Sequence, residues 1–169
     1  MLKLRKNKKG FTLVELIVVI AIMAVLAGTV AGVTVSQLNK KTDDTNKIQA
    51  QKIATSISGL ILESPEKYID FATGAASENT PSTSTQTTDT FKAGNDGAID
   101  LLLAELAKEF TGKTISASAP NKAGEFQLSL NNEKTKILVT FGAKTKEYKD
   151  TGYSISTDGV VAPYSKPKN

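Results

Sequence analysis

The stretch KKGFTLVELIVVIAI, residues 8–22, sets the organisation of the chain, because two lysines and a glycine give way there to a long apolar run. Within residues 11–35, Glu15 is the only charged side chain. As an α-helix this run would extend roughly 38 Å, at about 1.5 Å per residue. The apolar core of a bilayer is about 30 Å thick. We therefore predict a membrane-spanning helix at the N-terminus.

Basic residues are concentrated before this run. The first ten residues carry five basic and no acidic side chains, whereas the rest of the chain has 16 basic and 17 acidic side chains. By the positive-inside rule, residues 1–10 stay in the cytoplasm and the remainder faces outward. The near-neutral remainder offers no basic patch for direct nucleic-acid binding. The chain has no cysteine and no histidine, which excludes thiolate catalysis, Cys/His zinc sites and histidine acid–base chemistry.

Two simple explanations of the apolar run fit it poorly. A secretory signal peptide has a shorter apolar region of about 7–15 residues followed by a cleavage site. A plain single-pass anchor fits the length but leaves Glu15 unexplained, because a carboxylate in hydrocarbon costs about 2.5 kcal/mol or more.

The sequence GFTLVE, residues 10–15, follows a basic leader and resembles the processing site of type IV prepilins and pseudopilins. The resemblance implies that a prepilin peptidase cuts between Gly10 and Phe11 and that the new amino group on Phe11 is N-methylated. It also implies that Glu15 meets the amine of a neighbouring subunit and so fixes the axial register of assembly. A pair between Glu15 and the Phe11 amine of the same helix remains an alternative that geometry leaves open.

Gly28 and Gly32 form a G-x-x-x-G pattern, which lets membrane helices pack closely but is weak evidence alone. Members of the family commonly have a proline in this neighbourhood, and here the glycines stand instead. Each glycine costs about 1 kcal/mol of helix propensity relative to alanine. We expect residues 24–33 to be the part of the helix that unwinds most easily during assembly.

The first proline is Pro65, so one helix can run from residue 11 to about residue 62. Residues 39–47 contain no apolar side chain and are expected to form a solvated bridge, with one buried face from Ile48 onward. Four regions are predicted: a basic leader, a transmembrane and assembly helix, its amphipathic continuation, and an α+β head that contains a Ser/Thr-rich loop. They span residues 1–10, 11–35, 36–62 and 63–169, with the loop at 73–90.

The fold class expected is α+β. Ser64 and Pro65 are predicted to open a short turn, and Asn95 or Asp96 to cap a second helix that runs to about Phe110. Alternating apolar residues predict strands at 126–130 and 137–141, then one around 153–156 and a short one from Val160 that ends before Pro163. The turns fall at residues 131–132 and 158–159. The result is an antiparallel sheet of three or four strands, covered by the second half of the long helix.

No catalytic residue, cofactor or metal site is expected in the head, and the protein is not expected to be an enzyme. Asp96, Asp100, Glu105 and Glu109 lie on or near one predicted helix. However, the sequence GNDGAID around Asp96 lacks the ligand spacing of a calcium loop, and helix capping explains it better.

The resemblance implies a structural subunit that is cleaved, N-methylated and polymerised through its N-terminal helix into an extracellular filament. The expected partners are other copies of the chain, the prepilin peptidase, an inner-membrane assembly platform, and membrane lipid before assembly. The expected location is the cytoplasmic membrane first, with the N-terminus inside, and the cell surface afterwards. Three alternatives stay open: a pseudopilin of a type II secretion or DNA-uptake system, a minor pilin, and an anchored binding domain that never polymerises.

Overall fold

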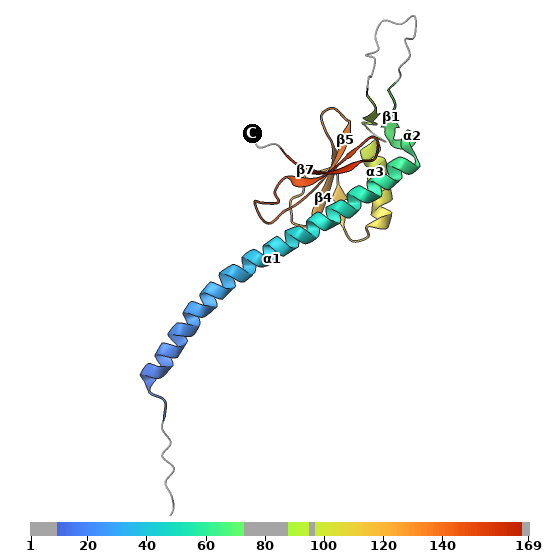
Figure 1. The fold of residues 1–169 in the computed structure, drawn as a ribbon. Coiled ribbons are helices and arrows are strands. Elements are labelled where there is room, and N and C mark those ends of the chain that lie inside the picture. The colour runs from blue at the N-terminus through green and yellow to red at the C-terminus, as the bar shows by residue number, and fades with distance from the viewer. Residues whose placement is uncertain (1–9, 73–87, 95–96, 167–169) are drawn as a thin grey trace, which may run out of the picture. The chain divides into compact units, whose positions relative to one another are not determined.

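The computed structural model describes residues 10–72, 88–94 and 97–166. It divides into two compact units, Met1–Asn39 and Lys40–Asn169. Helix α1, Leu13–Glu63, contributes to both units (Figure 1). The predicted helix over residues 11–62 agrees closely with it. The leader, except for Gly10, lies outside the described residues, as does the predicted Ser/Thr-rich loop from residue 73 to 87.

The first unit is the apolar part of α1. No proline interrupts it, and branched apolar residues cover all of its sides. All side chains from residue 10 to 38 are exposed, so no described residue covers this surface. Within the described part of the chain, α1 is the one helix long and apolar enough to cross a membrane.

The second unit, which we call the head, contains a mixed sheet. In the described residues five strands lie in the order β3-β4-β5-β6-β7. Strands β4 to β7 form an antiparallel meander, as predicted. The sequence did not predict β3, which pairs in parallel with β4. The bounds are β3 Thr114–Ser116, β4 Glu125–Leu130, β5 Lys136–Phe141, β6 Thr151–Ser156 and β7 Val161–Ser165.

One core joins the sheet to two helices, and this confirms the α+β class. The second part of α1 buries Ile53, Ile57 and Ile61, while α3, Ala98–Glu109, buries Leu102 and Leu106. Against them lie the inward-facing residues of the strands, which are Phe126, Leu128, Ile137, Val139, Phe141, Tyr153 and Ile155. The predicted burial of Ile48 is wrong: it is 56% exposed, because its position along the helix points away from the sheet.

Short elements lie at the end of the head where α1 ends. Helix α2, Pro65–Tyr68, begins after Ser64 with proline at its first position, as predicted. The N-cap of α3 is Gly97 and not Asn95 or Asp96, both of which lie outside the described residues. Strand β1, Ile69–Asp70, follows α2 directly and pairs antiparallel with β2, Thr90–Phe91. The sequence did not predict this pair of strands.

Asp43 corrects the prediction of a solvated bridge over residues 39–47. Its carboxylate is fully buried and accepts three hydrogen bonds from the loop between β5 and β6. The donors are the backbone N–H groups of Lys144 and Thr145, both at 2.8 Å, and the Thr145 hydroxyl at 2.7 Å. A segment without apolar residues is therefore a packed part of the head, held by polar contacts that hydrophobic periodicity does not reveal.

Replacing Asp43 by alanine is expected to lower the free energy of unfolding by about 4 kcal/mol. Three donors would lose their acceptor in a buried position, at roughly 1–3 kcal/mol for each unsatisfied group. Denaturant unfolding of the purified, detergent-solubilised protein measures the change. Asp43→Asn is the matched control: it keeps the shape and one side-chain oxygen, and should lose less than Asp43→Ala. If Asp43→Ala and the unmodified protein had the same free energy of unfolding, the role assigned to these hydrogen bonds would be refuted.

Tyr148 makes a second polar contact beside Asp43. Its hydroxyl donates a hydrogen bond to the Asp44 carboxylate. This bond, together with partial burial, raises the pKa of Tyr148 to about 12. The hydrogen bond favours the neutral phenol because only that form has the O–H group that donates a hydrogen bond to the carboxylate.

Because the pKa of Tyr148 is raised on folding, its contribution to stability should be complete below pH 10 or so, the pKa of a free tyrosine. It should disappear as the pH rises through about 12. Alkaline titration of tyrosinate absorbance should show a late step that is absent from Tyr148→Phe. Asp44→Asn should shift that step to lower pH, and an unchanged titration curve in both variants would contradict the assignment.

Pro163 lies inside β7, so the prediction that the last strand ends before it is wrong. The Lys166 N–H donates to the Asp150 carbonyl, which makes those two residues a hydrogen-bonded pair. Alternation along an antiparallel ladder then makes Pro163, opposite Tyr153, a non-hydrogen-bonded position whose nitrogen faces the open edge. The missing N–H therefore costs no ladder bond, and the strand continues to Ser165.

Candidate functional site

The predicted cleavage site lies just before α1, outside regular secondary structure. Gly10, Phe11 and Thr12 are outside the helix, and Phe11 is 91% exposed. A Cβ atom added to Gly10 would meet no atom within 4 Å. The fold of this chain therefore does not require glycine at position 10.

Thr12 and Glu15 form a capping box at the start of α1. The backbone N–H and the hydroxyl of Thr12 donate to Oε2 of Glu15, at 2.9 and 2.8 Å. In return, Thr12 Oγ1 accepts the backbone N–H of Glu15 at 3.3 Å. This reciprocal arrangement satisfies donors that a helix N-terminus otherwise leaves without partners. Sequence reasoning missed it, although Thr-x-x-Glu before an apolar run is the known signal for a capping box.

The capping box leaves one oxygen atom of the Glu15 carboxylate available to accept a further hydrogen bond. Among the described residues, both bonds to this carboxylate reach Oε2, and Oε1 has no partner. The negative charge also lies in the first turn of the helix, where the positive end of the helix dipole stabilises it. The side chain can thus be held by its own helix and still accept a donor from another molecule.

The structure places Gly28 and Gly32 inside α1, which continues as an α-helix through both residues. An added Cβ at either glycine would meet nothing within 4 Å. The hydroxyls of Thr29 and Thr34 donate to carbonyls of the preceding turn, those of Leu26 and Val30. The proposed unwinding of residues 24–33 remains a prediction.

The described residues of the head show no arrangement typical of a metal centre. Across residues 10–72, 88–94 and 97–166, no three Asp or Glu side chains lie where they could together hold a metal ion. Glu105 is instead bonded to Lys108 and Lys67, at 2.9 and 3.5 Å, and these contacts, that of Lys108 most of all, lower the pKa of its carboxyl group. Asp96, one of the acidic residues considered from sequence, lies outside the described residues.

The N-terminal segment matches a known protein family. The family described as the prokaryotic N-terminal methylation motif matches residues 5–31. No curated protein and no solved structure matches the chain. The matched residues include Gly10, Phe11, Glu15 and Gly28, whereas Gly32 lies just beyond the matched segment. The chain carries the signature of type IV prepilins and pseudopilins, and its α+β head follows a long apolar helix.

The motif indicates in general a structural subunit that assembles with its own kind after processing by a prepilin peptidase. Together with the apolar part of α1, it also indicates anchoring in the membrane before assembly. The motif lies within the first unit, and no comparison matches the head.

Proposed function

We propose that the protein is a type IV pilin subunit: it is cleaved between Gly10 and Phe11, N-methylated on Phe11, and polymerised into an extracellular filament. The observation that carries this proposal is the methylation motif joined to an apolar helix surface that the described residues leave uncovered. Burial of that surface, in lipid before assembly and among neighbouring helices afterwards, removes apolar side chains from water.

Glu15 is proposed to set the axial register of the filament. Cleavage converts the Phe11 nitrogen from an amide to a cationic amine, and that amine on a neighbouring subunit is the donor proposed for Oε1 of Glu15. A buried carboxylate is tolerated when a cation and further hydrogen bonds meet it, and Thr12 already provides two such bonds. A subunit that is one helical turn out of step would leave the carboxylate without its cation.

The motif is shared with pseudopilins, so a subunit of a type II secretion or DNA-uptake system is the second candidate. Deletion of the gene separates the two: loss of surface filaments indicates a pilin, and loss of secretion or uptake without visible filaments indicates a pseudopilin. The prepilin peptidase and an inner-membrane assembly platform are the partners proposed in either case.

Mass spectrometry of the N-terminal peptide from cells with an active prepilin peptidase tests the proposal. A peptide that begins at N-methylated Phe11 is the expected result. An intact leader that begins at Met1 would mean a simple membrane anchor, and the proposed role of Glu15 would fall with it.

A further inference from the structure

Charge is distributed unevenly along the head. The two ends are fixed by contacts with α1: the loop after β5 bonds to Asp43, while the turn after β6 accepts a hydrogen bond from Ser58 through the Gly159 carbonyl at 2.6 Å. The end of the head that contains the loop after β5 is called the basic end, and it comprises residues 40–50, 113–125, 142–150 and 166. The end that contains the turn after β6 is called the acidic end, and it comprises the described residues of 62–72, 88–101, 131–136 and 156–160.

The two ends carry opposite excess charge. Among the described residues, the basic end has nine lysines against five carboxylates, and the acidic end has seven carboxylates against four lysines. At the basic end Asp43 and Asp44 are bonded within the head, as is Glu125, which accepts the backbone N–H groups of Asn121 and Lys122. The carboxylates there are therefore largely engaged, whereas most of the lysines are exposed.

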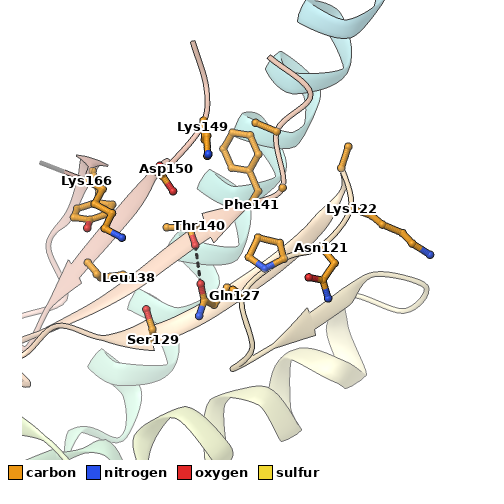
Figure 2. Close-up of a pocket in the computed structure, with 16 residues that line it drawn as sticks. Asn121, Lys122, Gln127, Ser129, Leu138, Thr140, Phe141, Lys149, Asp150 and Lys166 are labelled. Carbon is orange, nitrogen blue, oxygen red and sulfur yellow. Dashed lines mark hydrogen bonds between the residues drawn. The ribbon is translucent and has the colours of Figure 1, made fainter. Parts of the chain in front are cut away.

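A groove of ≈ 480 Å³ opens at the basic end and runs over the outer face of the sheet (Figure 2). Gln127 and Ser129 of β4, with Leu138 and Thr140 of β5, form its floor. The floor is mostly polar, and the Thr140 hydroxyl donates to Gln127 Oε1 at 3.4 Å.

Backbone contacts fix the walls of this groove. On one side, a Cβ atom added to Gly142 would lie 2.0 Å from the Lys122 carbonyl oxygen, so the loop before β4 is packed directly on the end of β5. On the other side, the Lys166 N–H donates to the Asp150 carbonyl at 3.0 Å. A groove with fixed walls needs little ordering when it binds a partner.

Three ammonium groups surround the groove. Lys122 stands on one side, Lys149 and Lys166 stand on the other, and Asp150 is the single carboxylate among the lining residues (Figure 2). In the part of the chain that the structure describes, none of these three lysines has a salt bridge. The chemistry of the rim therefore suits an acidic occupant.

An acidic surface of this kind exists at the other end of the same head. Glu63 and Glu66 are exposed, and among the described residues neither carboxylate forms a salt bridge. Glu63 ends α1, whose last turn has no basic residue, so the carboxylate adds to the negative end of the helix dipole. This position is unfavourable for an isolated helix, and a cationic partner from another molecule would relieve it.

We propose that the basic groove of one head binds the acidic end of the head of a second copy. The two surfaces are different, so the contact is head to tail and leaves a free groove on one copy and a free acidic end on the other. Contacts of this type repeat from copy to copy, and they generate an open filament when the rotation between copies does not close a ring. The inference rests on the proposed function, since it assumes that copies of the chain assemble.

Cysteine cross-linking tests the contact without relying on filament formation, because the natural chain has no cysteine. In membranes of cells that express the full-length chain, the double variant Lys149→Cys/Glu66→Cys should give a ladder of disulfide-linked multimers on oxidation. Each single variant should stay monomeric, because a head-to-tail contact does not bring two copies of one residue together. Absence of the ladder, or equal dimer formation by a single variant, would overturn the proposal.

Charge reversal tests the same contact in assembly. The variants Lys122→Glu/Lys149→Glu and Glu63→Lys/Glu66→Lys should each lower the yield of sheared filaments about tenfold, since opposed like charges disfavour association. Combining all four substitutions should restore most of the yield. Lys122→Arg/Lys149→Arg, which keeps the charge, is the matched control and should assemble normally. A combined variant no better than either parent would refute the contact.

These outcomes separate this inference from the proposed function. A cross-linked ladder formed by a chain that keeps its leader would support the head contact and contradict the pilin assignment. Normal processing and abundant filaments, with no ladder and no effect of charge reversal, would leave the pilin assignment standing and remove the head contact.

Discussion

Filaments are expected to disappear when Glu15 is replaced by valine, while cleavage after Gly10 continues. In the assembled state proposed here, the Phe11 amine of a neighbour meets the Glu15 carboxylate in an apolar environment. Removing one member of a buried ion pair costs roughly 3–5 kcal/mol. Since about 1.4 kcal/mol corresponds to a factor of ten, the yield of sheared filaments should fall by more than about a hundredfold.

Glu15→Gln is the control that separates charge from helix capping. Glutamine can occupy the same place in a capping box, so the bonds from Thr12 are retained in that variant. If charge pairing sets the register, Glu15→Gln should assemble almost as poorly as Glu15→Val. If glutamine supports normal filaments, the capping box alone explains the residue, and the proposed pairing between subunits is wrong.

The second large effect is expected at Gly10. Replacing it by valine should accumulate uncut precursor, because a branched side chain next to the scissile bond obstructs an extended backbone in a protease cleft. Immunoblotting and mass spectrometry of the membrane fraction should show a chain that keeps its leader, and few or no filaments.

The structure makes this experiment easy to interpret. No atom lies within 4 Å of a Cβ at position 10, so valine is accommodated without disturbing the rest of the chain. The head should therefore unfold at the same denaturant concentration as in the unmodified protein. A mature-length product from Gly10→Val would show that the peptidase does not need glycine at this position.

Features that follow from local pattern could be predicted from the sequence. The apolar run and the absence of proline before Pro65 predict α1 to within two residues at each end. The alternation of Phe126, Leu128 and Leu130 predicts β4, and the Asp-Gly pair at residues 158–159 predicts the last hairpin. The motif at residues 10–15 was visible for the same reason, since its elements are adjacent in the chain.

Features that depend on contacts distant in sequence could not be predicted. Asp43 is surrounded by polar residues and looks solvated, but it is buried because a loop about a hundred residues later supplies three donors. Strand β3 is a short, mostly polar segment that becomes a strand only by pairing with β4. The charge difference between the two ends of the head is likewise hidden in the sequence, because each end is assembled from several distant segments.

The proline in β7 has a consequence for the crowding of heads in the proposed filament. Heads held at high local concentration would be at risk of joining edge to edge into continuous sheets, which is how many aggregates begin. At this edge Pro163 presents no donor to an incoming strand. An incoming strand would therefore lose one hydrogen bond in the middle of β7, which weakens edge-to-edge pairing between the heads of the proposed filament.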